Sequence, residues 1–182
     1  ITVVPHILCG GFTKEETENV LIEMNFLGID DVLALRGDPQ KGNRRFIPEK
    51  DGHTHTYELV KQIVNMNNGK YLEESLEDTS PTNFCIGVAG YPEKHFEAPN
   101  RQLDLENLKH KVESGASYIV TQMFFDNRKF FRFRDECKKI GIKAPIIAGI
   151  KPISALNDIK LLPQTFHIDV PSDLVSAIQK CT

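Results

Sequence analysis

The sequence has no run of about 18 apolar residues, the length that a membrane-spanning helix requires. Its N-terminus also lacks the basic and then apolar layout that is typical of a signal peptide. Neither sign of charge is in large excess, because 22 Lys and Arg stand against 25 Asp and Glu. A weakly acidic chain does not attract phosphate backbones or anionic lipids, so we expect no nucleic-acid and no membrane partner. These absences favour a cytoplasmic protein that acts on a small molecule.

Several signatures of metal, nucleotide and hydrolase sites are also missing. The four cysteines form no C-x-x-C pair, so we expect them to be reduced and mostly packed. No G-x-G-x-x-G, G-x-S-x-G or H-E-x-x-H occurs. Residues 37–42 have the glycine spacing of a P-loop but continue with Asn43 and Arg44 instead of Lys and Ser or Thr. His53 and His55 alternate like metal ligands, but no third ligand is in view, so we expect a solvated helix start and no metal.

What the sequence does contain is the composition of an ordinary globular domain. Hydrophobic residues make up 40% of the chain and charged residues 26%. A chain of 182 residues can bury a substantial core, and we interpret residues 1–182 as a single domain. The chain opens on Ile-Thr-Val-Val without an initiator Met, so we expect it to belong to a larger protein.

Hydrophobic periodicity predicts strands and helices in alternation. The expected strands are residues 2–9, 31–35, 84–89, 117–123 and 144–150. The expected helices are residues 13–27, 57–66, 103–113, 127–140, 154–162 and 172–180. Thr13 and Glu16 have the spacing of a capping box, and Gly28, Gly115 and Gly141 follow expected helices. The polar segments 38–55 and 67–83 are interpreted as surface loops.

The expected strands are continuous apolar runs, which is typical of strands that are buried on both faces. This pattern predicts an α/β fold with a parallel sheet and right-handed crossovers. Two architectures remain, the open doubly wound sheet and the (β/α) barrel. A complete barrel needs eight units and about 250 residues, so about five units cannot form a complete one.

Polar residues gather where the expected strands stop, which is where parallel α/β folds bind their ligands. The residues that we expect at this rim are His6, Arg36, Asp38, Tyr91, His95 and Gln122. Donors and acceptors beside aromatic rings suit a planar polar ligand. Each feature also has an ordinary alternative, because His6 fits a core histidine and Arg36-Gly37-Asp38 fits a surface turn. Phe124 and Phe125 fit the core or an interface better than a platform on which a ligand stacks.

Taken together, these motifs resemble those of methylenetetrahydrofolate reductase. The matching elements are Pro5-His6, Leu35-Arg36-Gly37-Asp38, Gly90-Tyr91-Pro92-Glu93 with His95, Asp104 with Asn107 and Lys111, and Thr121-Gln122 with Phe124-Phe125-Asp126. The resemblance implies a (β/α)8 TIM barrel, incomplete here, that contributes about strands three to seven. It also implies an FAD-dependent oxidoreductase that uses NAD(P)H to reduce 5,10-methylenetetrahydrofolate to 5-methyltetrahydrofolate in one-carbon and methionine metabolism.

The resemblance also implies roles for individual residues. The implied flavin contacts are His6, Arg36, Gly37, Asp38, Thr56, Tyr91, His95, Asp104, Asn107 and Lys111. Asp38 and Gln122 would be catalytic and would contact the folate or the nicotinamide. Arg36 and Lys111 suit a diphosphate, and Asp104 would accept hydrogen bonds from ribose. A carboxylate such as Asp38 would disfavour the anionic reduced flavin and stabilise a cationic iminium derived from the folate.

The sequence also departs from the family pattern. The family's first two strands, with the Glu that serves as general acid, have no counterpart here, and neither has its last strand. We therefore expect little or no reductase activity from the chain alone, and association into a homo-oligomer through the open sheet edges. His55 stands where many members have Tyr, and Asp158 lies near the position of a folate-binding Gln.

Two other interpretations remain open. The first is a truncated barrel that binds FAD or a partner chain without catalysis. The second is a doubly wound domain that binds an anionic metabolite.

Overall fold

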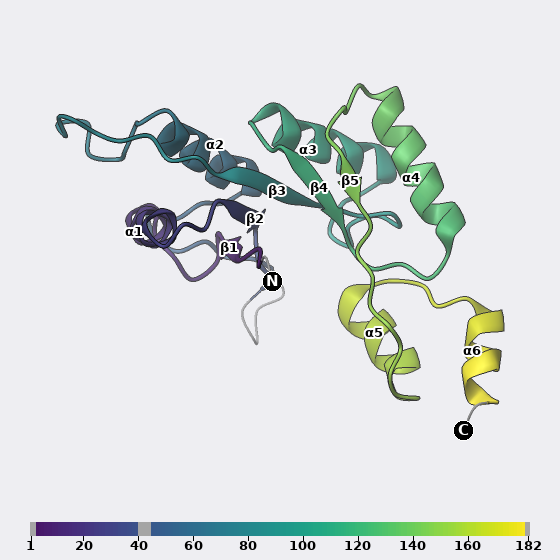
Figure 1. Ribbon diagram of the computed structural model, residues 1–182. Helices are drawn as coiled ribbons and strands as arrows, with labels where there is room; N and C mark the ends of the chain where they lie inside the picture. The colour runs from purple at the N-terminus through teal and green to yellow at the C-terminus, as the bar shows by residue number, and fades with distance from the viewer. Residues whose placement is uncertain (1–2, 40–44, 181–182) are drawn as a thin grey trace. The chain divides into compact units, whose positions relative to one another are not determined.

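Strands and helices alternate along the chain in the computed structural model, which describes residues 3–39 and 45–180 (Figure 1). The strands are β1 (His6–Leu8), β2 (Asp31–Leu35), β3 (Cys85–Gly90), β4 (Tyr118–Thr121) and β5 (Ile146–Ile147). The helices are α1 (Lys14–Phe26), α2 (Thr56–Asn67), α3 (Arg101–Glu113), α4 (Asn127–Lys139), α5 (Asp158–Phe166) and α6 (Ser172–Gln179). The predicted alternation is confirmed. Gly42, Asn43 and Arg44 of the P-loop-like segment lie outside the described residues.

The five strands form one sheet in the order β1-β2-β3-β4-β5. The pairs β1 with β2, β2 with β3, and β4 with β5 are parallel, as predicted. A doubly wound sheet reverses its strand order at the switch point, whereas consecutive strands of a (β/α) barrel are neighbours throughout. The observed order therefore favours part of a barrel-like fold over the doubly wound alternative.

The predicted helix ends are confirmed at both kinds of cap. At the start of α1, the Glu16 N–H donates to Thr13 Oγ1 at 3.1 Å and the Thr13 N–H donates to Glu16 Oε2 at 2.8 Å. After α1, α3 and α4, a glycine takes a positive φ, with values of 72° at Gly28, 119° at Gly115 and 87° at Gly141. A side chain disfavours this backbone conformation, so glycine ends the helix and turns the chain towards the next strand.

Three predicted boundaries differ most from the structure. Residues 3–5 lie outside β1, which begins at His6, so His6 is not near the end of its strand. β5 covers two residues instead of seven, because Pro145 has no N–H and the Gly149 N–H donates to Thr121 Oγ1 at 2.9 Å. A Cβ on Gly149 would lie 2.0 Å from the Thr121 carbonyl oxygen, so only glycine permits this approach.

The start of α5 also differs from the prediction. It begins at Asp158 and not at Ser154, because the Asp158 carboxylate accepts the N–H groups of Ser154 and Ala155 at 2.9 and 3.0 Å. These bonds form a turn ahead of the helix and lower the pKa of Asp158.

Contacts between residues divide the chain into two compact units. The first unit contains Ile1–Ala89 and His110–Tyr118, and the second contains Gly90–Lys109 and Ile119–Thr182. The core of the first unit consists of fully buried strand and helix residues, namely Val32, Ala34, Ile86, Val88, Leu59 and Ile63. The Tyr118 hydroxyl donates to the Val32 carbonyl at 3.0 Å in this core, and burial raises the pKa of Tyr118 to about 12.

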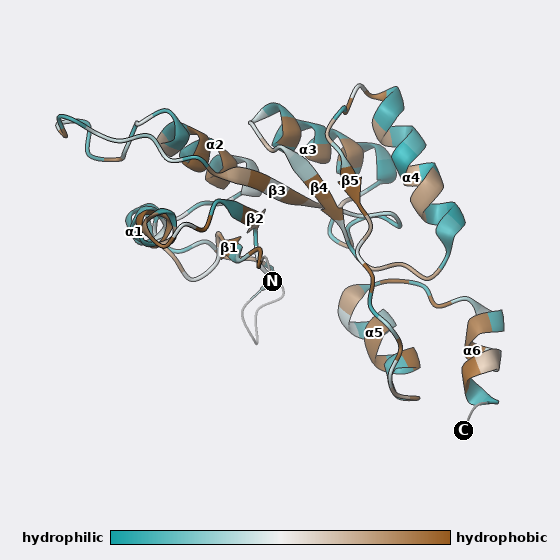
Figure 2. Ribbon diagram, in the orientation of Figure 1, coloured by the Kyte–Doolittle hydropathy of each residue, from teal (hydrophilic) through white to brown (hydrophobic). Residues whose placement is uncertain are grey.

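The second unit has a smaller apolar core. Ile119, Phe133, Cys137 and Leu162 are almost fully buried. Helix α5 buries only Leu162, and none of the eight residues of α6 is buried. Helix α4 is also coloured largely as hydrophilic (Figure 2). Over the described residues, 3–39 and 45–180, no helix is both long enough and apolar enough to cross a membrane.

Candidate cofactor and substrate site

Arg36, Gly37 and Asp38 follow β2 directly, as predicted. The Gly10 N–H donates to the Arg36 carbonyl at 3.1 Å, which extends the pairing of β1 and β2 past the last strand residue. The Arg36 guanidinium carbon lies 5.0 Å from the centre of the Phe46 ring, a cation–π distance. Arg36 is therefore anchored through both backbone and side chain, while Asp38 is exposed.

Thr56 and Lys111 lie at the ends of helices in the first unit. Thr56 is the first residue of α2. In the same first turn, the Glu58 carboxylate accepts the N–H groups of Thr54 and His55 at 2.8 and 3.1 Å. Burial opposes ionisation of Glu58, but these two donors outweigh burial and lower its pKa. Lys111 Nζ donates to the Ala89 carbonyl at 2.5 Å, which holds the ammonium group near the end of β3.

The structure corrects the interpretation of His6 as a core histidine and that of His53 as a solvated residue. His6 is exposed, so its alternative as a core histidine is wrong. The histidine in the core is His53, which is 3% exposed and has Nε2 2.5 Å from Gln62 Oε1. Burial lowers the pKa of His53, so the expected solvated position holds only for His55, which is exposed. Within the described part of the chain, no group of three His, Cys, Asp or Glu residues could hold a metal ion.

In the second unit, Tyr91 and His95 lie in the β3–α3 loop (residues 91–100). Their rings meet edge to face with centroids 4.6 Å apart, and the His95 ring stacks on Phe96 at 4.9 Å. The Glu97 N–H donates to His95 Nδ1 at 3.2 Å. This pair offers an aromatic surface with a fixed orientation beside the end of β3.

Asp104 and Asn107 lie on α3 in different environments. Asp104 is 8% exposed, and its Oδ2 accepts the His95 N–H at 3.1 Å. Asn107 is exposed. In this structure Asp104 therefore holds the β3–α3 loop at His95, whereas Asn107 is available to a ligand.

Gln122 follows β4, as predicted. Its N–H donates to the Gly90 carbonyl at 2.8 Å, and its side-chain oxygen accepts the Met123 N–H at 3.0 Å. The amide NH2 group is then the part of the side chain that can donate to a ligand. Phe124 stacks on Phe130 of α4 with centroids 5.0 Å apart, which agrees with a packing role.

Comparison with known protein families identifies the family of this chain. All of residues 1–182 match the methylenetetrahydrofolate reductase family. The chain belongs to the methylenetetrahydrofolate reductase family.

Individual relatives agree with the family match. "Methylenetetrahydrofolate reductase (NADH) 1" of Arabidopsis thaliana is 34% identical over 98% of this chain and 30% of its own length. The 5,10-methylenetetrahydrofolate reductase of Salmonella typhimurium is 34% identical over 94% of this chain and 51% of its own length. A probable NADPH form from Caenorhabditis elegans is 31% identical over 96% of this chain and 24% of its own length. The chain thus spans about half the length of the bacterial reductase and less of the others.

A solved structure also shares the fold. It is a protein from Clostridium thermocellum that binds two copies of 5-methyl-5,6,7,8-tetrahydrofolic acid. The likeness has a TM-score of 0.55 at 16% identity and covers 98% of this chain and 54% of that one.

The residues that the reductase family suggests fall into two sets. The first unit contains His6, Arg36, Gly37, Asp38, Thr56 and Lys111. The second unit contains Tyr91, His95, Asp104, Asn107 and Gln122. Within the second set, His95 contacts both Tyr91 and Asp104. The roles of all eleven residues in the reductase remain predictions.

Sequence reasoning missed three polar clusters. They are His53 with Gln62, Arg101 and Arg132 on Glu136, and Lys129 with Glu93 and Asp169. Only Arg132 and Glu136 had a visible signal, the i,i+4 spacing of an ion pair on a helix. The other partners come from separate segments, so no spacing in the sequence could reveal them.

Proposed function

We propose that this protein takes part in the flavin-dependent reduction of 5,10-methylenetetrahydrofolate to 5-methyltetrahydrofolate, with NAD(P)H as the hydride donor. The observation that carries the proposal is the match of residues 1–182 to one enzyme family. Relatives named for NADH and for NADPH match the chain similarly, so we propose NAD(P)H without a choice between them. The reaction belongs to one-carbon and methionine metabolism.

The side chains in both units fit FAD, which would supply the hydride-transfer chemistry when bound. In the first unit, Arg36 and Lys111 would bind the diphosphate, and their anchored positions near strand ends support this role. His6, Gly37, Asp38 and Thr56 would complete the contacts from this unit. The positive side chains would also draw an anionic cofactor to these strand ends.

In the second unit, the edge-to-face pair of Tyr91 and His95 suits contact with a planar ring. Asn107 is exposed and would hydrogen-bond the cofactor. Asp104 would act chiefly by holding His95, because one of its carboxylate oxygens accepts the His95 N–H. Because this carboxylate oxygen is engaged by His95, we propose the ribose contact of Asp104 only as a second role.

Asp38 and Gln122 would act on the substrate. An exposed carboxylate at Asp38 would stabilise positive charge that develops on the folate. The Gln122 amide NH2 would orient the folate or nicotinamide by donating a hydrogen bond. We expect little or no turnover from this chain alone, because no residue in it matches the family's general acid.

We further propose that both units belong to one barrel domain, that the protein is cytoplasmic, and that it forms homo-oligomers. Unpaired thiols at Cys9, Cys85 and Cys137 are compatible with a reducing compartment. The open ends of the strand order favour association.

The test is the visible absorption spectrum of the purified chain after incubation with FAD and desalting. We expect retained flavin absorbance, and an affinity for FAD at least about tenfold lower after Arg36→Ala with Asp38→Ala. Arg134→Ala with Asp135→Ala is the matched control, since it removes an exposed pair of the same charges. Absence of flavin from the wild-type chain would contradict the cofactor proposal for this chain.

The same samples separate reduction from binding without catalysis. NADH or NADPH is added with methylenetetrahydrofolate, and oxidation of the nicotinamide is followed. Flavin retention without turnover is the expected result. Robust turnover would show that the chain needs no further general acid.

A further inference from the structure

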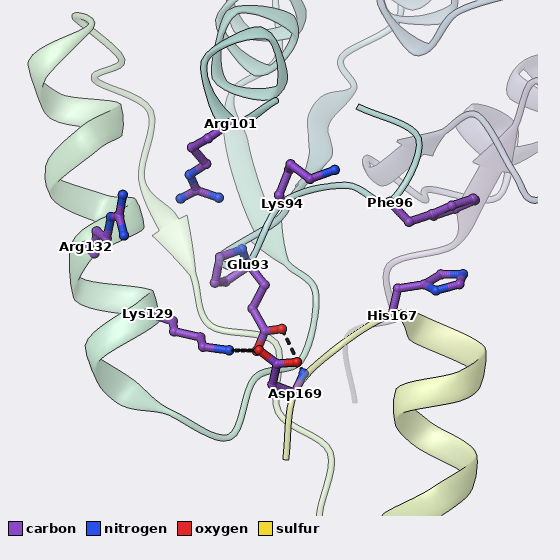
Figure 3. Close-up of a pocket in the computed structure, with 9 residues that line it drawn as sticks. Glu93, Lys94, Phe96, Arg101, Lys129, Arg132, His167 and Asp169 are labelled. Carbon is purple, nitrogen blue, oxygen red and sulfur yellow. Dashed lines mark hydrogen bonds and ion pairs between the residues drawn. The ribbon is translucent and has the colours of Figure 1, made fainter. Parts of the chain in front are cut away.

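A cavity of about 500 Å³ lies in the second unit beside the β3–α3 loop (Figure 3). Loop, helix and C-terminal segments contribute to its wall, which also contains Phe96 and His167. The charged side chains on the wall are four cations and two carboxylates, namely Lys94, Arg101, Lys129, Arg132, Glu93 and Asp169. Positive charge is in excess, so the cavity favours an anion.

One carboxylate orients two of the arginines. Arg101 Nε and Arg132 Nε donate to the two oxygens of Glu136, each at 2.8 Å. Arg101 Nη1 also donates to the Tyr91 carbonyl at 2.7 Å, so Arg101 forms a fixed part of the wall. Arg132 is held at Nε and its side chain remains 75% exposed, with its terminal nitrogens beyond that contact. A guanidinium oriented in this way can bind an oxyanion through two parallel hydrogen bonds.

Lys129 has a different part in the cavity. Its ammonium group pairs with Glu93 Oε1 at 3.1 Å and with the Asp169 carboxylate. The Asp169 N–H donates to Glu93 Oε2 at 2.8 Å. Both carboxylates of the wall pair with Lys129, and Glu136, which orients Arg101 and Arg132, is not among the residues that line the cavity, so the wall keeps an excess of positive charge.

Two strained residues face the same cavity. Lys94 has a φ of 120° and His167 a φ of 53°, conformations that residues other than glycine rarely adopt. The Lys94 ammonium donates to the carbonyls of His95 and Ala98 at 2.8 and 2.5 Å, and the His167 ring stacks on Phe96 at 4.4 Å. Strain of this kind concentrates at ligand sites, because surrounding contacts must maintain it.

We propose that this cavity binds an oxyanion, a phosphate or a carboxylate, of a reactant, with Arg132 as its principal contact. The proposal rests on the proposed function for the source of the anion. A nicotinamide dinucleotide brings phosphates, and a folate brings the carboxylates of its glutamyl end. The flat wall of Phe96 and His167 would lie beside the bound group.

The test is titration calorimetry of the full chain with two probes, inorganic pyrophosphate and γ-linked triglutamate, at low ionic strength. We expect at least one probe to bind, and Arg132→Gln to weaken its binding about tenfold. Arg132→Lys should give an intermediate loss, because lysine keeps the charge but not the planar fork. Arg134→Gln is the matched control, since Arg134 is exposed on the same helix but does not line the cavity.

The outcomes identify the source of the anion. Binding of pyrophosphate alone indicates the dinucleotide, and binding of triglutamate alone indicates the folate; binding of both supports a general oxyanion site. Binding of neither probe, or equal losses in Arg132→Gln and Arg134→Gln, would overturn the proposal.

FAD retention measured on the same samples separates the two proposals. A chain that retains FAD but binds neither probe contradicts only the cavity proposal. A chain that binds a probe through Arg132 but retains no FAD contradicts the flavin proposal.

Discussion

The two units hold their candidate residues by different means. In the first unit, backbone groups do so, because the Gly10 N–H holds the Arg36 carbonyl and the Ala89 carbonyl holds Lys111. In the second unit, backbone contacts such as the Gln122 N–H to the Gly90 carbonyl are combined with ion pairs between distant segments, as in the pairing of Lys129 with Glu93 and Asp169. Backbone groups keep their charge state at any pH, whereas ion pairs depend on pH and salt. The second unit should therefore be the more sensitive of the two to salt.

The two units also differ in how much apolar surface their cores bury. The first unit buries the side chains of α2 completely at Leu59, Val60, Ile63 and Met66. The second unit leaves α6 without a buried residue. Apolar burial therefore contributes more to the first unit. The four predictions below test how burial and charge stabilise the two units, from the largest expected effect to the smallest.

Leu59→Ala should reduce the free energy of unfolding by about 2–5 kcal/mol, because it leaves a cavity in the core of the first unit. Leu161→Ala in α5 is the control, and it should cost less than about 1 kcal/mol because Leu161 is 49% exposed. Urea denaturation followed by circular dichroism measures both. Equal losses would contradict the role of Leu59 in the core of the first unit.

Glu136→Gln should cost about 1–2 kcal/mol at neutral pH, because two arginines lose a shared carboxylate. Arg132 and Arg101 outweigh the opposing effect of burial and lower the pKa of Glu136 from its ordinary value of 4.5. A lowered pKa adds stability that is complete above this value and is lost as pH falls through the folded pKa. The difference between wild type and Glu136→Gln in urea should therefore shrink in acid, and a constant difference would argue against the ion pairs.

His53 should make the first unit sensitive to pH in a narrow window. Burial lowers its pKa below the ordinary 6.5, so the unfolded chain binds the proton more readily and stability falls as pH drops below about 6.5. The contribution of one proton is at most about 1.4 kcal/mol per pH unit. Urea midpoints between pH 5.5 and 7.5 should show a smaller slope for His53→Asn than for wild type. The exposed control, His55→Asn, should retain the wild-type slope.

Arg134→Gln should change the free energy of unfolding by less than about 0.5 kcal/mol. Its ion pair with Asp135 is exposed on both sides, and such pairs add little in water. The same denaturation experiment checks this value. If Arg134→Gln lowers the free energy of unfolding as much as Glu136→Gln does, exposure does not determine how much each ion pair of α4 stabilises the fold.

Much of the fold could be predicted because it depends on local patterns. The range of β2 was predicted without error, and the Thr13 cap and the glycines after three helices were found from short-range chemistry. The prediction failed where a partner from elsewhere intervened. β5 is short because Gly149 bonds to a Thr121 side chain 28 residues away.

The candidate site could be predicted to a similar extent and for similar reasons. Arg36 and Gln122 were found because they directly follow apolar runs. The contact of Asp104 with His95 was not foreseen, because it depends on how the β3–α3 loop folds back over α3. Arg132 had no sign of function in the sequence, since its interest comes only from the cavity that it lines.

By itself, the sequence determined the order of the strands and helices, that the strands run parallel, and that Arg36 and Gln122 directly follow strands. These properties follow from the periodicity of apolar residues and from short-range capping, which act within a few residues. The tertiary structure alone decided that His53 is buried, that Glu136 orients two arginines, and that Lys129 joins three segments. Burial and ion pairing depend on distances between segments far apart in the chain, and those distances exist only after the core has packed.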